Sequence, residues 1–413
     1  MTSSRSPRLY TPAFWLACAI HVTGGLSLNM FLLFPLFVRR VGGGDLAIGL
    51  VVALGTAASV LARPLVGHLL DHAGRRPVLL AAGALNVLSL LPFLAIRTFG
   101  PALLGAAVLH WIVWGALFAA YFTYASDLSP PARRAEGIAI FGVFGLLSIG
   151  AGPVLGERLI AGAGFPAFFA AAAALALVSA LLTLAVPRAP AVRAVTPIGG
   201  GAALVRAVRR GGLGRVLGVT AMLGAAVDVA LFFVAPFTRD VGLARAAPFF
   251  AAHAATSIAV RLLGSRVLDR LGAHRVAIPM FVVLAVGLGA LALMPAPGLL
   301  VLAGACCGAA HGTLFPVLNA LALGRAPVTL EGRAVSLVTA AFDLGAALAT
   351  PAGGALAEAV GYPATFAASA LLGLAAAAAL ATDPWPRGLR DSRRARRRGG
   401  GSSGCTTAAP CGS

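Results

Sequence analysis

Two aspartates lie in the middle of long apolar stretches of the chain. Asp228 falls within the apolar run Met222–Val234, with no arginine a helical turn away, and Asp343 occupies a similar position. A charge placed inside a membrane costs several kcal/mol, so a carboxylate found there is a functional candidate. Desolvation favours the protonated form of a carboxylate, which makes both residues candidate proton carriers. For Asp343, a hydrogen bond to a neighbouring helix is an equal alternative.

Histidines, asparagines and aromatic residues also fall in apolar stretches. Each of His21, His110, His253 and His311 could relay protons, with His110 the strongest of the four, although a lone membrane histidine is more often a packed hydrogen-bonding residue. Aromatic residues between Trp111 and Tyr124 fit a cavity wall and interface anchoring equally well. The candidate cavity residues are Asn29, Trp114, Tyr121, His311 and Asn319. The histidines and cysteines have no metal-ligand spacing, so we expect no metal.

The composition of the whole chain limits the fold class. Of 413 residues, 59% are hydrophobic and only 11% charged, against roughly 25% charged in soluble domains. Mean hydropathy is +0.92. A soluble enzyme, a disordered protein and a secreted disulfide scaffold are thereby excluded. No nucleophile–base arrangement or cofactor loop is present, and without lysine the chain cannot hold a P-loop. We therefore expect an all-α membrane protein that is not an enzyme and needs no cofactor.

Apolar stretches long enough to cross a bilayer as helices recur twelve times. They divide into two sets of six, which predicts two bundles at 12–186 and 215–382. The remaining segments are an N-terminal segment (1–11), a linker (187–214) and a basic, Gly/Ser-rich tail (383–413). The predicted spans are 12–38, 46–68, 77–97, 101–125, 137–158, 165–186, 215–238, 246–265, 276–294, 299–323, 333–356 and 362–382.

The arginines are distributed unevenly between the two sides of this predicted topology. With both termini inside, 26 of the 32 arginines fall on cytoplasmic segments, as positive-inside orientation requires. Because the charge is spread over short turns near the membrane, we expect no nucleic-acid partner. The cluster Arg390–Arg398 is typical of a tail attracted to anionic lipid of the inner leaflet.

The chain contains an internal repeat. Arg63, Asp71 and Gly74 recur as Arg261, Asp269 and Gly272, each 198 residues later, and the same offset carries Gly152-Pro153-x-x-Gly156 onto Thr350-Pro351-x-x-Gly354. Parallel repeats of this kind are a transporter architecture, with the substrate site near the midplane between the repeats.

Both repeated motifs have a physical interpretation. In the first, glycines allow helix ends to approach closely, and Asp71 can face a helix N-terminus and local arginines, while Arg75 or Arg76 pairs with Asp127. Such a cluster forms a breakable cytoplasmic gate; topology anchoring is the alternative. The predicted gate residues are Gly67, Asp71, Gly74, Arg75, Arg76, Asp127, Asp269, Arg270 and Gly272.

The second motif predicts bends in the fifth and eleventh helices. Its proline removes a backbone hydrogen bond, and its glycines let each helix lie close against the other half. An ordinary kinked, tightly packed helix is the alternative. The residues are Gly152, Pro153, Gly156, Pro351 and Gly354.

These motifs resemble the major facilitator superfamily over residues 12–382. Gly67-x-x-x-Asp71-x-x-Gly74-Arg75-Arg76 looks like the family's loop between helices 2 and 3, and Gly152-Pro153-x-x-Gly156 looks like the motif of its proton-driven antiporters. Phe342-Asp343-Leu-Gly345 and Leu314-Phe315-Pro316-x-Leu-Asn319 are similar to sugar-efflux and drug-exporter members. Two departures are His72, where arginine is frequent, and a fourth helix without the arginine that many antiporters carry.

Together, these observations predict a twelve-helix secondary transporter working by alternating access. The resemblance implies a monomer in the inner membrane that exports a small organic molecule, such as a drug or sugar-like metabolite, against protons. Proton-coupled uptake is one alternative, and a non-transporting sensor or scaffold is another.

Overall fold

The computed structural model describes residues 8–187, 206, 208–209, 212–264, 270–293, 296–326 and 330–383. Within these ranges the ordered elements are helices, with no strand. In a bilayer only intrahelical bonds or a closed barrel satisfy the backbone, so long apolar helices are the expected solution. The predicted gate residue Asp269, most of the predicted linker and the arginine-rich tail lie outside the described residues.

The first half of the chain builds one group of helices. Its elements are α1 (Pro12–Met30), η1 (Phe31–Leu33), α2 (Phe34–Arg40), α3 (Asp45–His72), α4 (Arg75–Leu90), η2 (Leu91–Leu94), α5 (Pro101–Leu128), η3 (Pro131–Arg133) and α6 (Arg134–Thr183). The helical course of α6 breaks at Gly164, whose φ of +76° lies in the left-handed region that suits glycine. The two parts of α6 therefore form two separate crossings.

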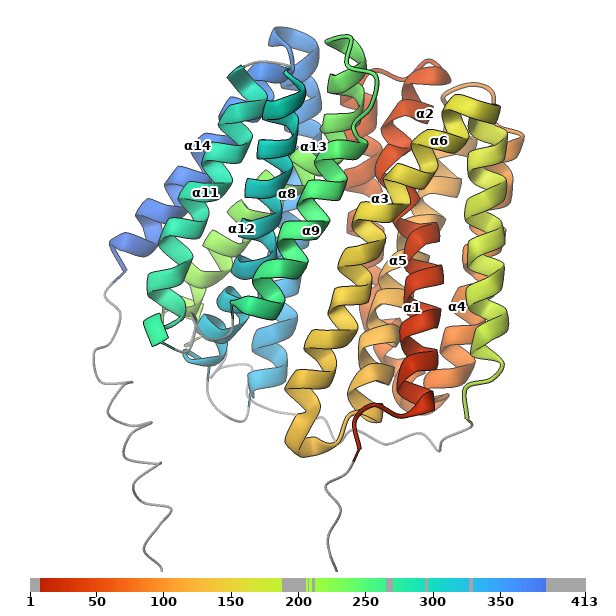
Figure 1. Cartoon of the computed structure of the whole chain (residues 1–413), viewed down its shortest axis with the longest axis vertical. Coiled ribbons are helices and arrows are strands. Elements are labelled where there is room, and N and C mark those ends of the chain that lie inside the picture. Colours follow the sequence, from red (N-terminus) through yellow and green to blue (C-terminus); the bar gives the residue numbers. More distant parts are fainter. Residues whose placement is uncertain are drawn as a thin grey trace, which may run out of the picture.

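The second half builds the other group. Its elements are α8 (Leu213–Asp240), α9 (Ala247–Leu263), α11 (Ala273–Leu293), α12 (Pro297–Leu323), α13 (Glu331–Val360) and α14 (Tyr362–Ala381). Figure 1 shows the two groups side by side, with the start of α1 and the end of α14 at the same end of the bundle. We call this the terminal end, and the opposite one the distal end.

The described helices account for twelve crossings. Ten helical stretches are long and apolar enough to span a membrane. One of them, Pro131–Thr183, contains the break at Gly164 and crosses twice, and α9 adds a shorter apolar helix. The all-α, twelve-helix prediction is thus confirmed.

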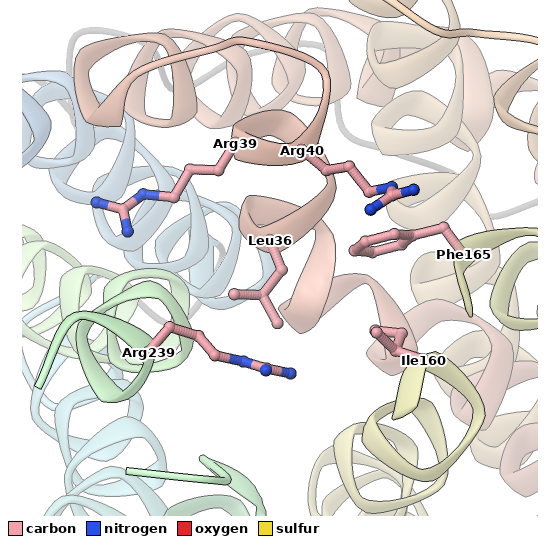
Figure 2. Close-up of a pocket in the computed structure, with 6 residues that line it drawn as sticks. All are labelled: Leu36, Arg39, Arg40, Ile160, Phe165 and Arg239. Carbon is pink, nitrogen blue, oxygen red and sulfur yellow. The ribbon is translucent and has the colours of Figure 1, made fainter. Parts of the chain in front are cut away.

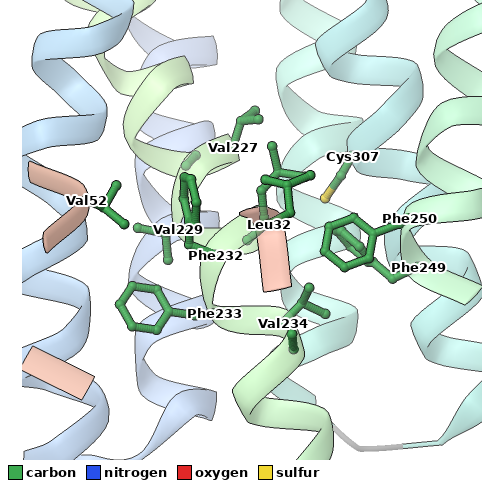
Figure 3. Close-up of a cluster of buried hydrophobic side chains, with 14 of the residues drawn as sticks. Leu32, Val52, Val227, Val229, Phe232, Phe233, Val234, Phe249, Phe250 and Cys307 are labelled. Carbon is green, nitrogen blue, oxygen red and sulfur yellow. The ribbon is translucent and has the colours of Figure 1, made fainter. Parts of the chain in front are cut away.

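Small residues set how closely the helices approach. Within the second half, a Cβ on Gly224 would lie 2.0 Å from the Phe342 carbonyl oxygen, and one on Gly345 would lie 1.8 Å from that of Ala221. The backbones of α8 and α13 therefore touch, as in other membrane helix pairs. Buried side chains of both halves, among them Leu32, Val52 and Phe232, form one continuous core (Figure 3).

Candidate transport site

An ion pair joins the two halves inside the helical region. Arg63 of α3 donates from Nη2 to Oδ2 of Asp343 in α13. The side chains are 33% and 20% exposed, so both are largely removed from water. Removing one partner of such a pair would leave an uncompensated charge, which is strongly destabilising. The pair is therefore a strong link between the halves as long as both groups stay charged.

Asp228 lies next to this ion pair. It follows Gly224 by one turn of α8, at the level where α8 and α13 touch, and its carboxylate lies close enough to Asp343 for the two charges to repel. Asp228 is partly exposed. The structure thus brings together the two acids that the sequence singles out.

A second arginine reaches from the second half to the first. Arg261 of α9 is half-buried, and its Nη1 lies 2.6 Å from the position that a Cβ would take at Gly142 of α6. Its charge also acts on the imidazole of His311 in α12. Within the described ranges, no carboxylate forms an ion pair with Arg261.

His311 and His253 form a pair next to Arg261. Their rings lie 5.5 Å apart, and His311 stacks on Phe342 with ring centroids 5.9 Å apart. Nδ1 of His311 and both ring nitrogens of His253 are buried without a hydrogen-bond partner. The predicted cavity residue Asn319 is half-buried; it donates to the Phe315 carbonyl, and its own amide oxygen has no partner.

The remaining candidates lie inside the first half. His110 is fully buried, stacks on Phe31 at 3.8 Å and hydrogen-bonds Ser89 at 3.0 Å. Tyr121 is buried with its hydroxyl 3.3 Å from Ser179. Aromatic packing inside this half removes them from the central ion pair.

Two further predicted cavity residues belong to the same half. Asn29 is buried and donates to the Gly25 carbonyl of its own helix. Trp114 is half-buried and packs near Trp111.

Glycines of α6 make contacts that differ in part from those expected. Gly152 faces the α1 backbone at Asn29, and Gly156 faces Leu33 and Phe168, so both pack within their own half. Gly142 and Gly150, eight residues apart and hence on one face of the helix, instead meet α9 of the other half. The expectation that the Gly152 face contacts the other half is wrong.

The equivalent segment of α13 does pack across the halves. A Cβ on Gly354 would lie 2.2 Å from the Asp45 carbonyl oxygen, and one on Gly49 would lie 2.2 Å from that of Thr350 next to Pro351. Pro153 and Pro351 both lie inside their helices.

The distal end is held closed by bonds between the halves. Arg39 binds Asp45 of its own half at 2.9 Å and Asp240 of the other half at 2.5 Å. Tyr362 donates its hydroxyl to Asp45 at 2.7 Å, again across the halves. Because both groups of each Arg39 pair are ionised, such bonds are stronger than neutral ones.

Two glutamates add a matched pair of distal contacts. Glu157 of α6 accepts backbone N–H groups of Ala246 and Ala247, at 2.6 and 3.0 Å, where α9 begins. Glu358 of α13 accepts the N–H of Leu46, at 2.9 Å, where α3 begins. Each half thus binds a helix N-terminus of the other, where free N–H groups and the helix dipole favour a carboxylate.

A cavity of about 510 Å³ opens beside these contacts at the distal end. Figure 2 shows Arg40 and Arg239 extending toward Phe165 and Ile160, whereas Arg39 points away from them. The acids that Arg39 binds are Asp45 and Asp240. Arg40 and Arg239 are exposed, and in the part of the chain that the structure describes neither forms an ion pair. The lining of this distal cavity is therefore positively charged.

Contacts at the terminal end hold each half together. Arg75 binds Asp127 at 2.7 Å and lies 3.7 Å from Asp71, while Arg76 donates instead to the Leu184 carbonyl. All these partners belong to the first half. In the second half, Arg215 lies 3.5 Å from Asp383.

The glycines of the predicted gate differ in role. Gly74 and its repeat Gly272 have φ of +88° and +82°, which glycine adopts without strain. Each directly precedes a helix, and Arg270 lies exposed just before Gly272. Gly67 has open space where a Cβ would be, so the expected close approach there is absent in this arrangement.

Sequence reasoning missed Arg63 and Arg261 as site residues. Their closeness to the cytoplasmic turns of the predicted topology favours an orienting role, yet both fall inside predicted spans and recur at the offset of 198. An arginine inside a span is itself a functional signal. Among the described residues, no group of three or more His, Cys, Asp or Glu could hold a metal.

Two pseudo-equivalent six-helix groups with a charged site between them define a secondary transporter of the membrane, not an enzyme. The sequence model of the Major Facilitator Superfamily matches residues 15–298 and 241–403. The chain therefore belongs to the Major Facilitator Superfamily.

Individual relatives agree with this assignment. An uncharacterized MFS-type transporter of Salmonella typhimurium is 28% identical over 373 residues, covering 86% of this chain and 92% of the relative. The nucleoside transporter NupG has a similar fold, with a TM-score of 0.73 and 15% identity over 90% of this chain and 98% of that chain. The human organic anion transporter MFSD10 has a TM-score of 0.65 and 19% identity, over 90% and 100%. These structures share the fold with this chain.

Proposed function

We propose that this chain is a proton-coupled exporter of a small organic molecule, acting as a monomer in the cytoplasmic (inner) membrane. The observation that supports it most is the Arg63–Asp343 ion pair between the halves, with Asp228 beside it. Protonation of Asp343 would remove the charge that binds Arg63. Proton binding at the site would therefore weaken a link between the halves.

Asp228 is the proposed proton carrier. No basic side chain forms an ion pair with it among the described residues, and it lies near a second carboxylate. Hydration of Asp228 from one side or the other would change its affinity for a proton. A ligand drives a conformational change only through its different affinity for the two states, and this difference supplies the coupling.

The proposed orientation places the terminal end in the cytoplasm. Arg63 and Arg261 lie at the interface between the halves, so they are removed from the cytoplasmic count, and 24 arginines against 6 still favour this side. In the proposed orientation, the bonds of Arg39, Tyr362 and the glutamates at the distal end would keep this state closed toward the outer side. The arginine-rich tail would then face anionic lipid of the inner leaflet.

The direction of transport rests on the Gly152-Pro153-x-x-Gly156 segment, which resembles that of proton-driven antiporters. Proton-coupled uptake of a metabolite is the second candidate. It would use the same carboxylates, with substrate and proton moving in the same direction. A non-transporting sensor would not need an ion pair that protons can break.

A flux assay tests the proposal. The purified chain is reconstituted into liposomes with an imposed pH gradient, and a panel of small organic molecules is scored for movement in both directions. In wild type, substrate should move in the direction opposite to the protons. In Asp228→Asn it should move only down its own concentration gradient. Glu136→Gln, which changes an exposed carboxylate at the start of α6, is the control and should behave as wild type. Movement with the protons would establish uptake, and no gradient-dependent flux at all would refute transport coupling.

A further inference from the structure

Only one of the two arginines in the central site has an acidic partner among the described residues. Arg63 has Asp343 as its partner, whereas Arg261 has no carboxylate partner among the described residues. Arg261 is half-buried and reaches into the other half next to Gly142. A buried charge without a counter-ion is costly, so a partner that is not part of the described protein would stabilise this state.

The internal repeat indicates where that partner is missing. Arg63 of α3 meets α13 of the other half, and its repeat Arg261 in α9 meets the first part of α6 in the same way. At the offset of 198 the position equivalent to Asp343 is Gly145, three residues after Gly142. One copy of the interface has an acid beside its arginine. In the other copy Gly142 lies against the arginine and Gly145 faces His21 of its own half, so no acidic side chain stands there.

The surroundings of Arg261 fit an acidic group with an apolar body. His311 lies near it with a buried, unpartnered Nδ1, and the ring of Phe342 stacks on His311. A carboxylate can accept two parallel hydrogen bonds from a guanidinium, while the imidazole offers a further polar contact.

We propose that the central site binds a small organic acid in its carboxylate form, with the carboxylate on Arg261 in the place of the missing acidic side chain. This inference rests on the proposed function, because it assigns the substrate class of the same site. The ligand would bind Arg261 of the second half, whose guanidinium itself lies against Gly142 of the first. It would thereby complete a second charged link between the halves.

A binding experiment on the full-length purified chain tests this assignment. Thermal unfolding is followed with benzoate and with its neutral analogue benzamide, and with butyrate and butyramide. The carboxylates should raise the melting temperature and the amides should not. Arg261→Gln should bind the carboxylate at least ten-fold more weakly, which corresponds to about 1.4 kcal/mol. Arg261→Lys, which keeps the charge but loses the planar fork, should be intermediate.

The stability of the ligand-free variants separates binding from a structural role. If Arg261 lacks a counter-ion, the empty Arg261→Gln variant should melt no lower than wild type. A structural arginine would lower the melting temperature when replaced. Arg97→Gln, an exposed arginine in a distal loop, controls for loss of charge elsewhere.

The outcomes distinguish this inference from the proposed function. Equal stabilisation by the amides, equal binding by Arg261→Gln, or no binding of either carboxylate would overturn the assignment. Carboxylate binding without proton-driven flux would leave it standing and refute the transport proposal. Proton-driven flux of neutral or cationic molecules that persists in Arg261→Gln would support the transport proposal and refute the assignment of an organic acid as substrate.

Discussion

Replacing Glu157 by glutamine should shift the protein toward a state open at the distal end. Glu157 is 4% exposed and accepts two backbone N–H groups at the start of α9, in the other half. Glutamine has almost the same shape, but only one of its terminal atoms can accept. Its amide group would face one of the two N–H groups, so one bond and the negative charge are lost.

The size of the shift follows from these contacts. Hydrogen bonds to a charged group contribute about 1.5–3 kcal/mol each when buried. The loss of one bond therefore changes the open-to-closed ratio by roughly 10- to 150-fold, since about 1.4 kcal/mol is a factor of ten. Glu358 makes a single bond from an exposed position. Solvent screening limits the contribution of this bond to below about 1 kcal/mol, so Glu358→Gln should shift the open-to-closed ratio by about five-fold at most.

Distances between spin labels measure this ratio directly. Labels at Ala102 of α5 and Gly298 of α12 are exposed at the distal ends of opposite halves, on a background without the five native cysteines. Glu157→Gln should move a large part of the population to longer distances, and Glu358→Gln a small part. Tyr121→Phe removes a buried tyrosine bond inside one half and should leave the distribution as in wild type.

The reverse result would refute this reasoning. An unchanged distance distribution in Glu157→Gln would mean that these bonds do not hold the distal end closed. A larger effect of Glu358→Gln than of Glu157→Gln would mean that burial does not determine the strength of the two contacts.

Three further outcomes are expected. Asp228→Asn should still bind or exchange substrate but should lose the accumulation that a pH gradient drives. If Asp228→Asn keeps gradient-driven transport and Asp343→Asn loses it, the proton carrier is Asp343 of α13 instead. Asp127→Asn should reduce transport more than Asp71→Asn, because Arg75 lies 2.7 Å from Asp127 and 3.7 Å from Asp71; equal wild-type rates would reduce the cluster to a topology signal. Single cysteines at Ala194 and Ser402 should resist an impermeant reagent in intact cells, and ready labelling of either would reverse the orientation.

Much of the fold could be predicted from the sequence, because hydropathy and the repeat are properties of the chain alone. Apolar length predicts the crossings, and the offset of 198 predicts two equivalent halves. Even the break at Gly164 falls in the gap between the predicted spans 137–158 and 165–186. These features need no knowledge of which helix faces meet.

The site depends on those faces and could be predicted only in part. Asp228 and Asp343 stand out because acids are costly in a membrane wherever they point. His110 and Tyr121 have equally suitable chemistry, but the aromatic packing of their own half buries them. Arg63 was overlooked because an arginine near a helix end also satisfies the orientation rule. Only the position of α13 shows that Asp343 is its partner.

The two halves close the distal end with similar contacts from non-equivalent positions of the repeat, whereas the centre differs between the two copies. Glu157 and Glu358 each bind a helix N-terminus of the opposite half, so the distal closure is made twice. In the centre the arginine is repeated but its paired acid is not, because Gly145 stands at the position equivalent to Asp343. A second acid would neutralise Arg261 and leave the site without a charge for substrate. Under the two proposals, one ion pair and one unpaired arginine would separate two tasks. Asp228 and the neighbouring Arg63–Asp343 pair would respond to protons, and Arg261 would bind the transported molecule.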